Sequence, residues 1–208
     1  MSVIDKLAWA TGNRDEEANI ELAKQIAKKN DKDAVAELVA NLTAKKAAIR
    51  SDCIKALYEL GELKPELIAP YEKDFLKLLT SKENRLQWGA MTALSCICKV
   101  SPKTIYKSLS VIMDAANKGT VITNDRAVRI LITLTAQKEY AANTFTLLID
   151  KLKSCPDNQL PMYVEQSMEI INDKNRAPYI KVLQSRLDDI EKESKRKRVE
   201  KVIKKLSK

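Results

Sequence analysis

Residues 52–61, with the sequence DCIKALYELG, decide the fold of this chain. Four of them, Cys53, Ala56, Leu57 and Leu60, have the i, i+3, i+4, i+7 spacing of one helix face. The same face returns at a period of 37 residues, as Ala90, Ala93, Leu94 and Ile97, then Ala127, Ile130, Leu131 and Leu134, then Val164, Ser167, Met168 and Ile171. One period shared by four registers predicts an array of helical repeats.

Each repeat also has a second apolar pattern, which predicts amphipathic helices of about four turns. These patterns are Ile68, Tyr71, Phe75 and Leu78–Leu79; Ile105, Leu109, Ile112–Met113 and Ala116; Phe145, Leu148–Ile149 and Leu152; and Tyr179, Val182–Leu183, Leu187 and Ile190. One first-helix segment, 130–135 (ILITLT), is β-branched and resembles a strand locally. Because it matches the period, we expect it to be helical.

The N-terminal part fits an atypical first repeat. Asn13 and Glu16 have the spacing of a capping box, which predicts a helix reaching about Lys29. Asp31 is a candidate N-cap for a second helix that ends near Leu42. Residues 2–11 would then cover the open end of the array, because a terminal repeat needs a polar outer surface.

The segments 52–61 and 88–94 (WGAMTAL), together with the recurring proline Pro65 and Pro102, resemble the HEAT/armadillo class of repeats. The resemblance covers about residues 14–190. The chain is similar to small, functionally unassigned prokaryotic HEAT-repeat proteins. It implies an all-α fold, a right-handed α-α superhelix of four to five helical hairpins whose surface binds a partner. The recurring Asp and Arg of the usual HEAT pattern are missing at matched positions.

The period also suggests a domain organisation. We expect one repeat domain over 1–190, with repeats near 14–45, 46–82, 83–119, 120–156 and 157–190, followed by 191–208 as a basic amphipathic helix or cap. The glycines Gly61 and Gly119 stand where periodic segments stop, so both are expected to be helix C-caps.

Composition excludes several kinds of chemistry. The chain contains no histidine, which removes Ser-His-Asp and Cys-His catalysis and His-ligated zinc. The four glycines lie too far apart for a phosphate-binding loop. Among the four cysteines, Cys96 and Cys98 form a C-x-C pair with nothing to complete a tetrahedral metal site. We therefore expect no catalysis, no cofactor and no metal.

The location is inferred from hydropathy and from the cysteines. The longest apolar run is four residues, 7–10, which is too short for a membrane span or a signal-peptide core. We expect a cytoplasmic protein with reduced thiols, since disulfides are rare in that compartment.

Charge concentrates at the C-terminal end. The chain has a net charge of +9, and residues 191–208 carry nine basic and three acidic residues. Its candidate anion contacts are Lys195, Arg196, Lys197, Arg198 and Lys201. Because Val199, Val202–Ile203 and Leu206 have helical spacing, the segment is either an anion-binding arm or a capping helix that seals the last repeat.

The candidate partner contacts lie on the helix predicted around residue 90. At 100° per residue, Trp88 falls opposite the apolar face together with Thr92, Ser95 and Lys99. Exposed tryptophan often anchors an interface, so Trp88, Thr92 and Lys99 are the candidate contact set. The alternative is that Trp88 packs under a neighbouring hairpin.

These observations favour a non-catalytic interaction or scaffold module that binds a protein or peptide. The alternative is a nucleic-acid-binding protein related to the HEAT-like DNA alkylation-repair proteins. That activity, as the resemblance implies it, needs tryptophans and an Asp/Arg set, which the two tryptophans Trp9 and Trp88 do not match. No basic stripe recurs either, because Lys73 and Lys77 correspond to Ser110 and Asp114 one period later.

Overall fold

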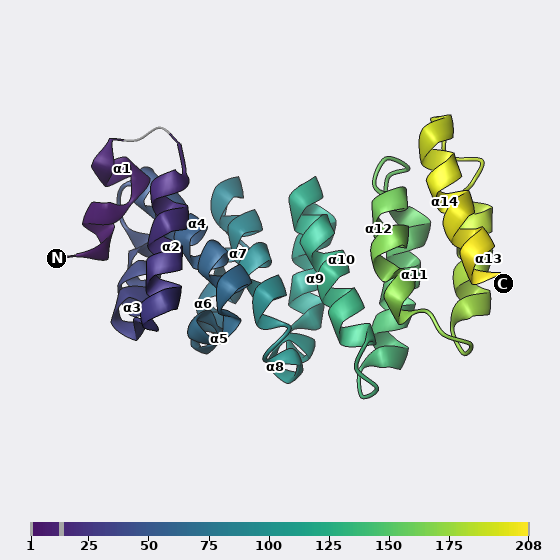
Figure 1. Cartoon of the computed structure of the whole chain (residues 1–208), viewed down its shortest axis with the longest axis horizontal. Coiled ribbons are helices and arrows are strands. Elements are labelled where there is room, and N and C mark those ends of the chain that lie inside the picture. Colours follow the sequence, from purple (N-terminus) through teal and green to yellow (C-terminus); the bar gives the residue numbers. More distant parts are fainter. Residues whose placement is uncertain (1, 13–14, 208) are drawn as a thin grey trace. The chain divides into compact units, whose positions relative to one another are not determined.

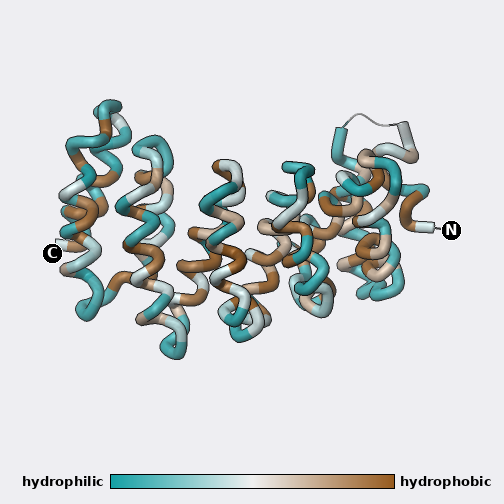
Figure 2. Tube along the Cα trace, turned by 180° about the vertical axis from the view of Figure 1, so that it is seen from behind, coloured by the Kyte–Doolittle hydropathy of each residue, from teal (hydrophilic) through white to brown (hydrophobic). Residues whose placement is uncertain are grey.

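The structure is a computed structural model that describes residues 2–12 and 15–207. In this part of the chain every regular element is a helix (Figure 1). The chain divides into two compact units, 1–127 and 128–208, and the division falls inside α10 (Val121–Thr135). In each unit, hydrophobic residues concentrate along the middle of the helices, whereas the turns are mostly polar (Figure 2).

Unit 1 starts with two short elements and continues with helical hairpins. Its elements before α10 are η1 (Val3–Lys6), α1 (Ala8–Thr11), α2 (Glu17–Lys29), α3 (Lys32–Ala40), η2 (Asn41–Thr43), α4 (Ala47–Leu63), α5 (Pro65–Ile68), η3 (Ala69–Tyr71), α6 (Glu72–Leu78), α7 (Asn84–Ile97), α8 (Pro102–Lys107) and α9 (Leu109–Lys118). Asp31 caps α3 as predicted, because its carboxylate accepts a hydrogen bond of 3.0 Å from the Ala34 amide. The other predicted cap, Asn13, lies outside the described residues.

The core of unit 1 follows the 37-residue period. Helix α4 packs between α2 and α7, and each of its four periodic residues is completely buried. The corresponding four residues of α7 are also completely buried, from Ala90 to Ile97. The predicted repeat register is therefore confirmed in α4 and α7.

Two glycines allow α4 and α7 to approach closely. Gly61 lies inside α4 and is not its C-cap, so that prediction is wrong; Gly119 does cap α9 as predicted. A Cβ atom at Gly61 would lie 3.1 Å from the Cβ of Cys96 in α7. A Cβ atom at Gly89 would lie 2.6 Å from Cγ1 of Ile54 in α4. At Gly89 the facing helix therefore occupies the space of a side chain. At Gly61 both α7 and Cδ1 of Ile68 in α5, which would lie 2.6 Å from the added Cβ, occupy it.

The second helices of unit 1 are less regular than predicted. In place of one four-turn helix, residues 65–78 form α5, η3 and α6. Pro70 lies within η3, and proline lacks the amide hydrogen that a continuous helix needs. In the next repeat α8 and α9 are separated at Ser108. Buried anchors such as Ile68, Phe75 and Ile112 nevertheless occupy the predicted positions.

Unit 2 follows the same plan, and each of its second helices, α11 and α13, is uninterrupted. After α10 its elements are α11 (Ala141–Ser154), α12 (Leu160–Ser167), η4 (Met168–Ile170), α13 (Arg176–Ser185) and α14 (Glu193–Leu206). The β-branched segment 130–135 is helical, as the period predicted. In the last register Val164 and Ser167 are completely buried, whereas Met168 and Ile171 are only half-buried. The reason is that α12 ends at Ser167, where the chain turns into η4.

An arginine joins the end of α11 to the end of α13. The guanidinium of Arg186 donates to the carbonyl oxygens of Leu152, Lys153 and Cys155 at 2.6, 2.8 and 2.9 Å. It also pairs with Asp189 at 2.5 Å. The last turn of a helix leaves carbonyl groups without helical partners, and Arg186 satisfies three carbonyls there.

The C-terminal helix α14 packs against α12 and α13. Its Val199 and Val202 are buried, while Lys201, Lys204 and Lys205 are exposed on its outer side. The helix is therefore amphipathic as predicted, with its apolar stripe placed against the last hairpin.

The close contact between Gly89 and Ile54 predicts that a side chain at position 89 lowers the free energy of unfolding. Gly89→Ala would gain about 1 kcal/mol of helix propensity. We expect overpacking against Ile54 to exceed that gain, so that the free energy of unfolding falls by about 1–3 kcal/mol. Urea unfolding of the variant measures this, and an unchanged or increased stability would contradict the close approach of α4 and α7.

The packing of α14 predicts two different results for its stripe and its charges. Removing residues 191–208 should lower the melting temperature, since burying each valine contributes about 1.5–3 kcal/mol. Replacing Lys201, Lys204 and Lys205 with glutamine should change the melting temperature little, because exposed charges contribute weakly. Thermal unfolding followed by circular dichroism compares the two; a truncated chain that melts like the full chain would exclude a capping role.

Candidate functional site

Trp88 lies in an aromatic cluster of unit 1 rather than on open surface. It is half-buried, and its ring lies 5.6 Å from that of Tyr58 in α4, with a tilt of 49°. The guanidinium of Arg85 lies 4.5 Å from the Trp88 ring, in cation–π contact. One side of Trp88 is thus covered by its own unit, as the alternative interpretation of this residue expected.

Charged groups from α4, from α7 and from the residue before α2 surround this cluster. Lys55 is buried and pairs with Glu59 at 2.7 Å and with Glu16, the residue before α2, at 3.3 Å. Glu16 also pairs with Arg85. Burial by itself would lower the pKa of Lys55, but its contacts with Glu59 and Tyr58 outweigh this and raise the pKa above its ordinary value. Lys55 therefore remains charged and links the start of α2 to α4, whereas Glu16 reaches α7 through Arg85.

The other predicted contacts on α7 differ from the expectation. Thr92 is 1% exposed, and its hydroxyl donates to the Trp88 carbonyl at 2.9 Å. Ser95 is also buried, so the expectation that both face outward is wrong. The helical wheel assumed one buried side, whereas α7 packs against α4 on one side and α6 on another. Lys99 is exposed and pairs with Glu62 at 3.5 Å.

The predicted anion contacts on α14 are mostly engaged within unit 2. Arg198 holds both carboxylate oxygens of Glu165, at 2.8 and 2.6 Å, and this hydrogen bonding lowers the pKa of Glu165. Arg196 donates twice to the Ile190 carbonyl, at 3.1 and 2.9 Å. Lys195 contacts Asn158, and Lys197 pairs with Glu193 at 2.7 Å. Lys201 is exposed, and its charge also helps to lower the pKa of Glu165.

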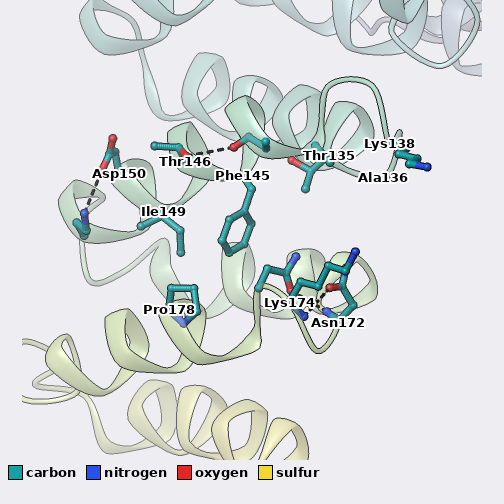
Figure 3. Close-up of a pocket in the computed structure, with 14 residues that line it drawn as sticks. Thr135, Ala136, Lys138, Phe145, Thr146, Ile149, Asp150, Asn172, Lys174 and Pro178 are labelled. Atoms are coloured by element: carbon teal, nitrogen blue, oxygen red, sulfur yellow. Dashed lines mark hydrogen bonds and ion pairs between the residues drawn. The ribbon is translucent and has the colours of Figure 1, made fainter.

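A groove with a volume of about 890 Å³ opens in unit 2 between α11 and α13. The periodic sequence pattern does not predict this groove. Its middle is apolar: Phe145 and Ile149 come from α11, and Pro178 comes from α13 (Figure 3). Phe145 is half-buried and Pro178 is exposed. A volume of this size falls in the range of about 300–1,000 Å³ that is typical of ligand-binding pockets.

The two ends of the groove differ in charge. Figure 3 shows Asp150 on one side of Phe145, and Lys138 and Lys174 on the other. Asp150 is neutralised by Lys153 at 3.0 Å. Lys138 stands in the turn before α11, and Lys174 stands in the corresponding turn before α13. The periodic pattern places Phe145 among the core positions. The groove is apparent only from the partial exposure of the Phe145 side chain, which the pattern does not report.

The thiols are placed for packing rather than for chemistry. All four cysteines are buried thiols that are not joined in disulfides. Burial raises the pKa of the Cys53 and Cys98 thiols to about 12, and it also raises the pKa of Cys155. A protonated thiol is a poor nucleophile and a poor metal ligand.

Among the described residues, no group of three or more cysteine and carboxylate side chains is close enough to hold a metal ion. Over the same residues, no helix combines the length and the apolar character that crossing a bilayer requires.

Comparison with known proteins relates the chain to others by structure only. No family model matches the sequence, and no curated protein matches it significantly. A designed armadillo repeat protein in complex with the peptide (KR)4 has a TM-score of 0.66 at 14% identity, over 90% of this chain and 86% of that chain. Computationally designed armadillo repeat proteins for modular peptide recognition have a TM-score of 0.64 at 16% identity, over 94% of this chain and 95% of that chain. An engineered protein has a TM-score of 0.61 at 20% identity, over 99% of this chain and 98% of that chain. The chain therefore has an all-α helical repeat fold of the armadillo type, as the resemblance implied.

Proposed function

We propose that this chain is a non-catalytic module that binds a protein or peptide partner on its helical-repeat surface. The groove between α11 and α13 carries the proposal, because it offers an apolar floor with charged ends. Such a floor is suited to an inserted side chain, and polar groups around it can fix the orientation of a bound segment. The designed relatives of the same fold, one of them in complex with a peptide, support this use of a repeat surface.

The cluster around Trp88 is the second candidate surface, and it supports binding less well. Thr92 is buried and cannot reach a partner, and Trp88 is covered by Arg85. Arg85 and Lys55 both pair with Glu16 within unit 1. A partner that used Trp88 would have to compete with these contacts. The groove needs no such rearrangement, since Phe145 and Pro178 already reach its open surface.

Selection of peptides from a random displayed library against the full chain tests the proposal. Ala142 is exposed and lines the groove, so Ala142→Trp should fill it without disturbing the core. Gln184→Trp adds the same side chain at an exposed position of α13 outside the groove and serves as the control. We expect selected peptides to bind with micromolar Kd, about −8 kcal/mol, and to weaken at least about tenfold on Ala142→Trp alone.

Two results would contradict this proposal. One is a selection that enriches no peptide, and the other is a set of peptides that bind the Ala142→Trp variant as well as the unchanged chain.

A titration with duplex DNA tests the nucleic-acid alternative directly. Arg196 and Arg198 are occupied by Ile190 and Glu165, so few basic groups of α14 remain for phosphates. We expect no binding tighter than the range of about 10⁻⁴–10⁻⁶ M that is typical of non-specific contacts near physiological salt. Tighter, steeply salt-dependent binding that is lost on replacing Lys201, Lys204 and Lys205 with glutamine would favour the alternative.

A further inference from the structure

The charges that line the groove of unit 2 indicate the chemistry of its partner. Its floor, made by Phe145, Ile149 and Pro178, is apolar. Four of its lining residues are charged: Lys138, Asp150, Lys153 and Lys174. The Asp150 carboxylate is already paired with Lys153, so the charge that remains available to a partner is positive.

The two remaining lysines lie at the same end of the groove. Lys138 and Lys174 are exposed and appear together on one side of Phe145 (Figure 3). Within the described residues, neither lysine is paired with a carboxylate. This contrasts with Lys55, Lys99, Lys153 and Lys197, each of which has an acidic partner in its own unit.

The turn that carries Lys174 is held in place by its neighbours. The backbone N–H of Asn172 donates to the side-chain oxygen of Asn175 at 2.7 Å, and the backbone N–H of Lys174 donates to the side-chain oxygen of Asn172 at 3.0 Å. The Asn175 side chain in turn donates to the Ile170 carbonyl at 3.0 Å. Asx-type hydrogen bonds of this kind fix a turn, so Lys174 projects from a preorganised position. Preorganisation reduces the entropy lost on binding.

Resting on the proposed function, we infer that the groove binds an acidic segment of a partner protein, with one large apolar side chain beside its carboxylates. The apolar side chain contacts Phe145, Ile149 and Pro178. The carboxylates lie at the far end, against Lys138 and Lys174. Charge complementarity selects this occupant over a basic segment, which would meet the two lysines with like charge, and over a neutral one, which would leave both without a partner.

Three synthetic peptides of about ten residues test the inference by fluorescence anisotropy with the full chain. The first has one phenylalanine followed by aspartates, the second replaces each aspartate with asparagine, and the third replaces each with lysine. We expect the acidic peptide to bind at least about tenfold more tightly than the neutral one, and the basic peptide to bind most weakly. Raising the salt from low to about 0.5 M should reduce this difference, because exposed charges are screened.

Matched variants locate the effect in the groove. The double variant Lys138→Glu, Lys174→Glu should weaken the acidic peptide by at least about tenfold and favour the basic one. The control Lys181→Glu, Lys192→Glu changes the net charge equally at exposed positions outside the groove and should leave binding nearly unchanged. Phe145→Ala should weaken the acidic and the neutral peptide alike, and circular dichroism establishes that each variant is folded.

The outcomes separate this inference from the proposed function. A neutral or basic peptide that binds best, with sensitivity to Ala142→Trp, would overturn the acidic partner while supporting a peptide-binding groove. Equal weakening by the groove and control charge variants would also overturn it, because the attraction would then be general. If none of the three peptides binds, the inference fails, and the library selection decides separately whether the groove binds other peptides.

Discussion

The contact between α4 and α7 is the constraint on which the packing of unit 1 depends. Gly61 and Gly89 have no room for a side chain, and Ala56, Ala90 and Ala93 between them are small and fully buried. Small residues let two helices approach, and their larger neighbours, such as Leu57 and Leu94, then fill the interior. The position of the Trp88–Tyr58 pair follows from this approach, because the two rings come from α7 and α4.

Much of the basic character of the chain serves internal contacts. Arg50 donates to the Ala44 and Lys45 carbonyls and pairs with Glu83. Arg186 binds carbonyl oxygens at the end of α11, and Arg196 binds the Ile190 carbonyl in the loop before α14. A guanidinium suits this task because its donors lie in one plane and can reach several acceptors. Net charge alone is therefore a poor guide to partners here. Lys138 and Lys174 of the α11–α13 groove are informative because, unlike Lys153, they have no carboxylate partner among the described residues.

The repeat pattern predicted the buried positions well, and the reason is physical. A period of apolar residues reports which side of a helix is covered, so Cys53, Leu94 and Leu131 were all placed correctly in the core. It cannot report whether a second side is covered too, which is why Thr92 was wrongly expected to face outward. The apolar pattern stops at Gly61, which is why a helix end was expected there. Gly61 instead lies within α4, at a point of close contact.

The groove could not be found from the sequence, because it depends on how far apart α11 and α13 stand. Phe145 fits the periodic pattern as well as a fully buried residue does, and nothing in the pattern distinguishes a ring at the edge of the interior. Lys138 and Lys174 are separated by nearly one repeat, so their common position at one end of the groove appears only in three dimensions.

The three carbonyl contacts of Arg186 have a dynamic consequence for this groove. The guanidinium belongs to the end of α13 and binds the end of α11, which are the two helices that form the walls. The last turn of α11 therefore cannot unwind without breaking contacts to the neighbouring hairpin. We therefore expect local opening to involve both walls as one cooperative unit, with amide protons at the two helix ends exchanging with solvent together. A bound segment would meet walls of fixed separation rather than two independently fraying helices.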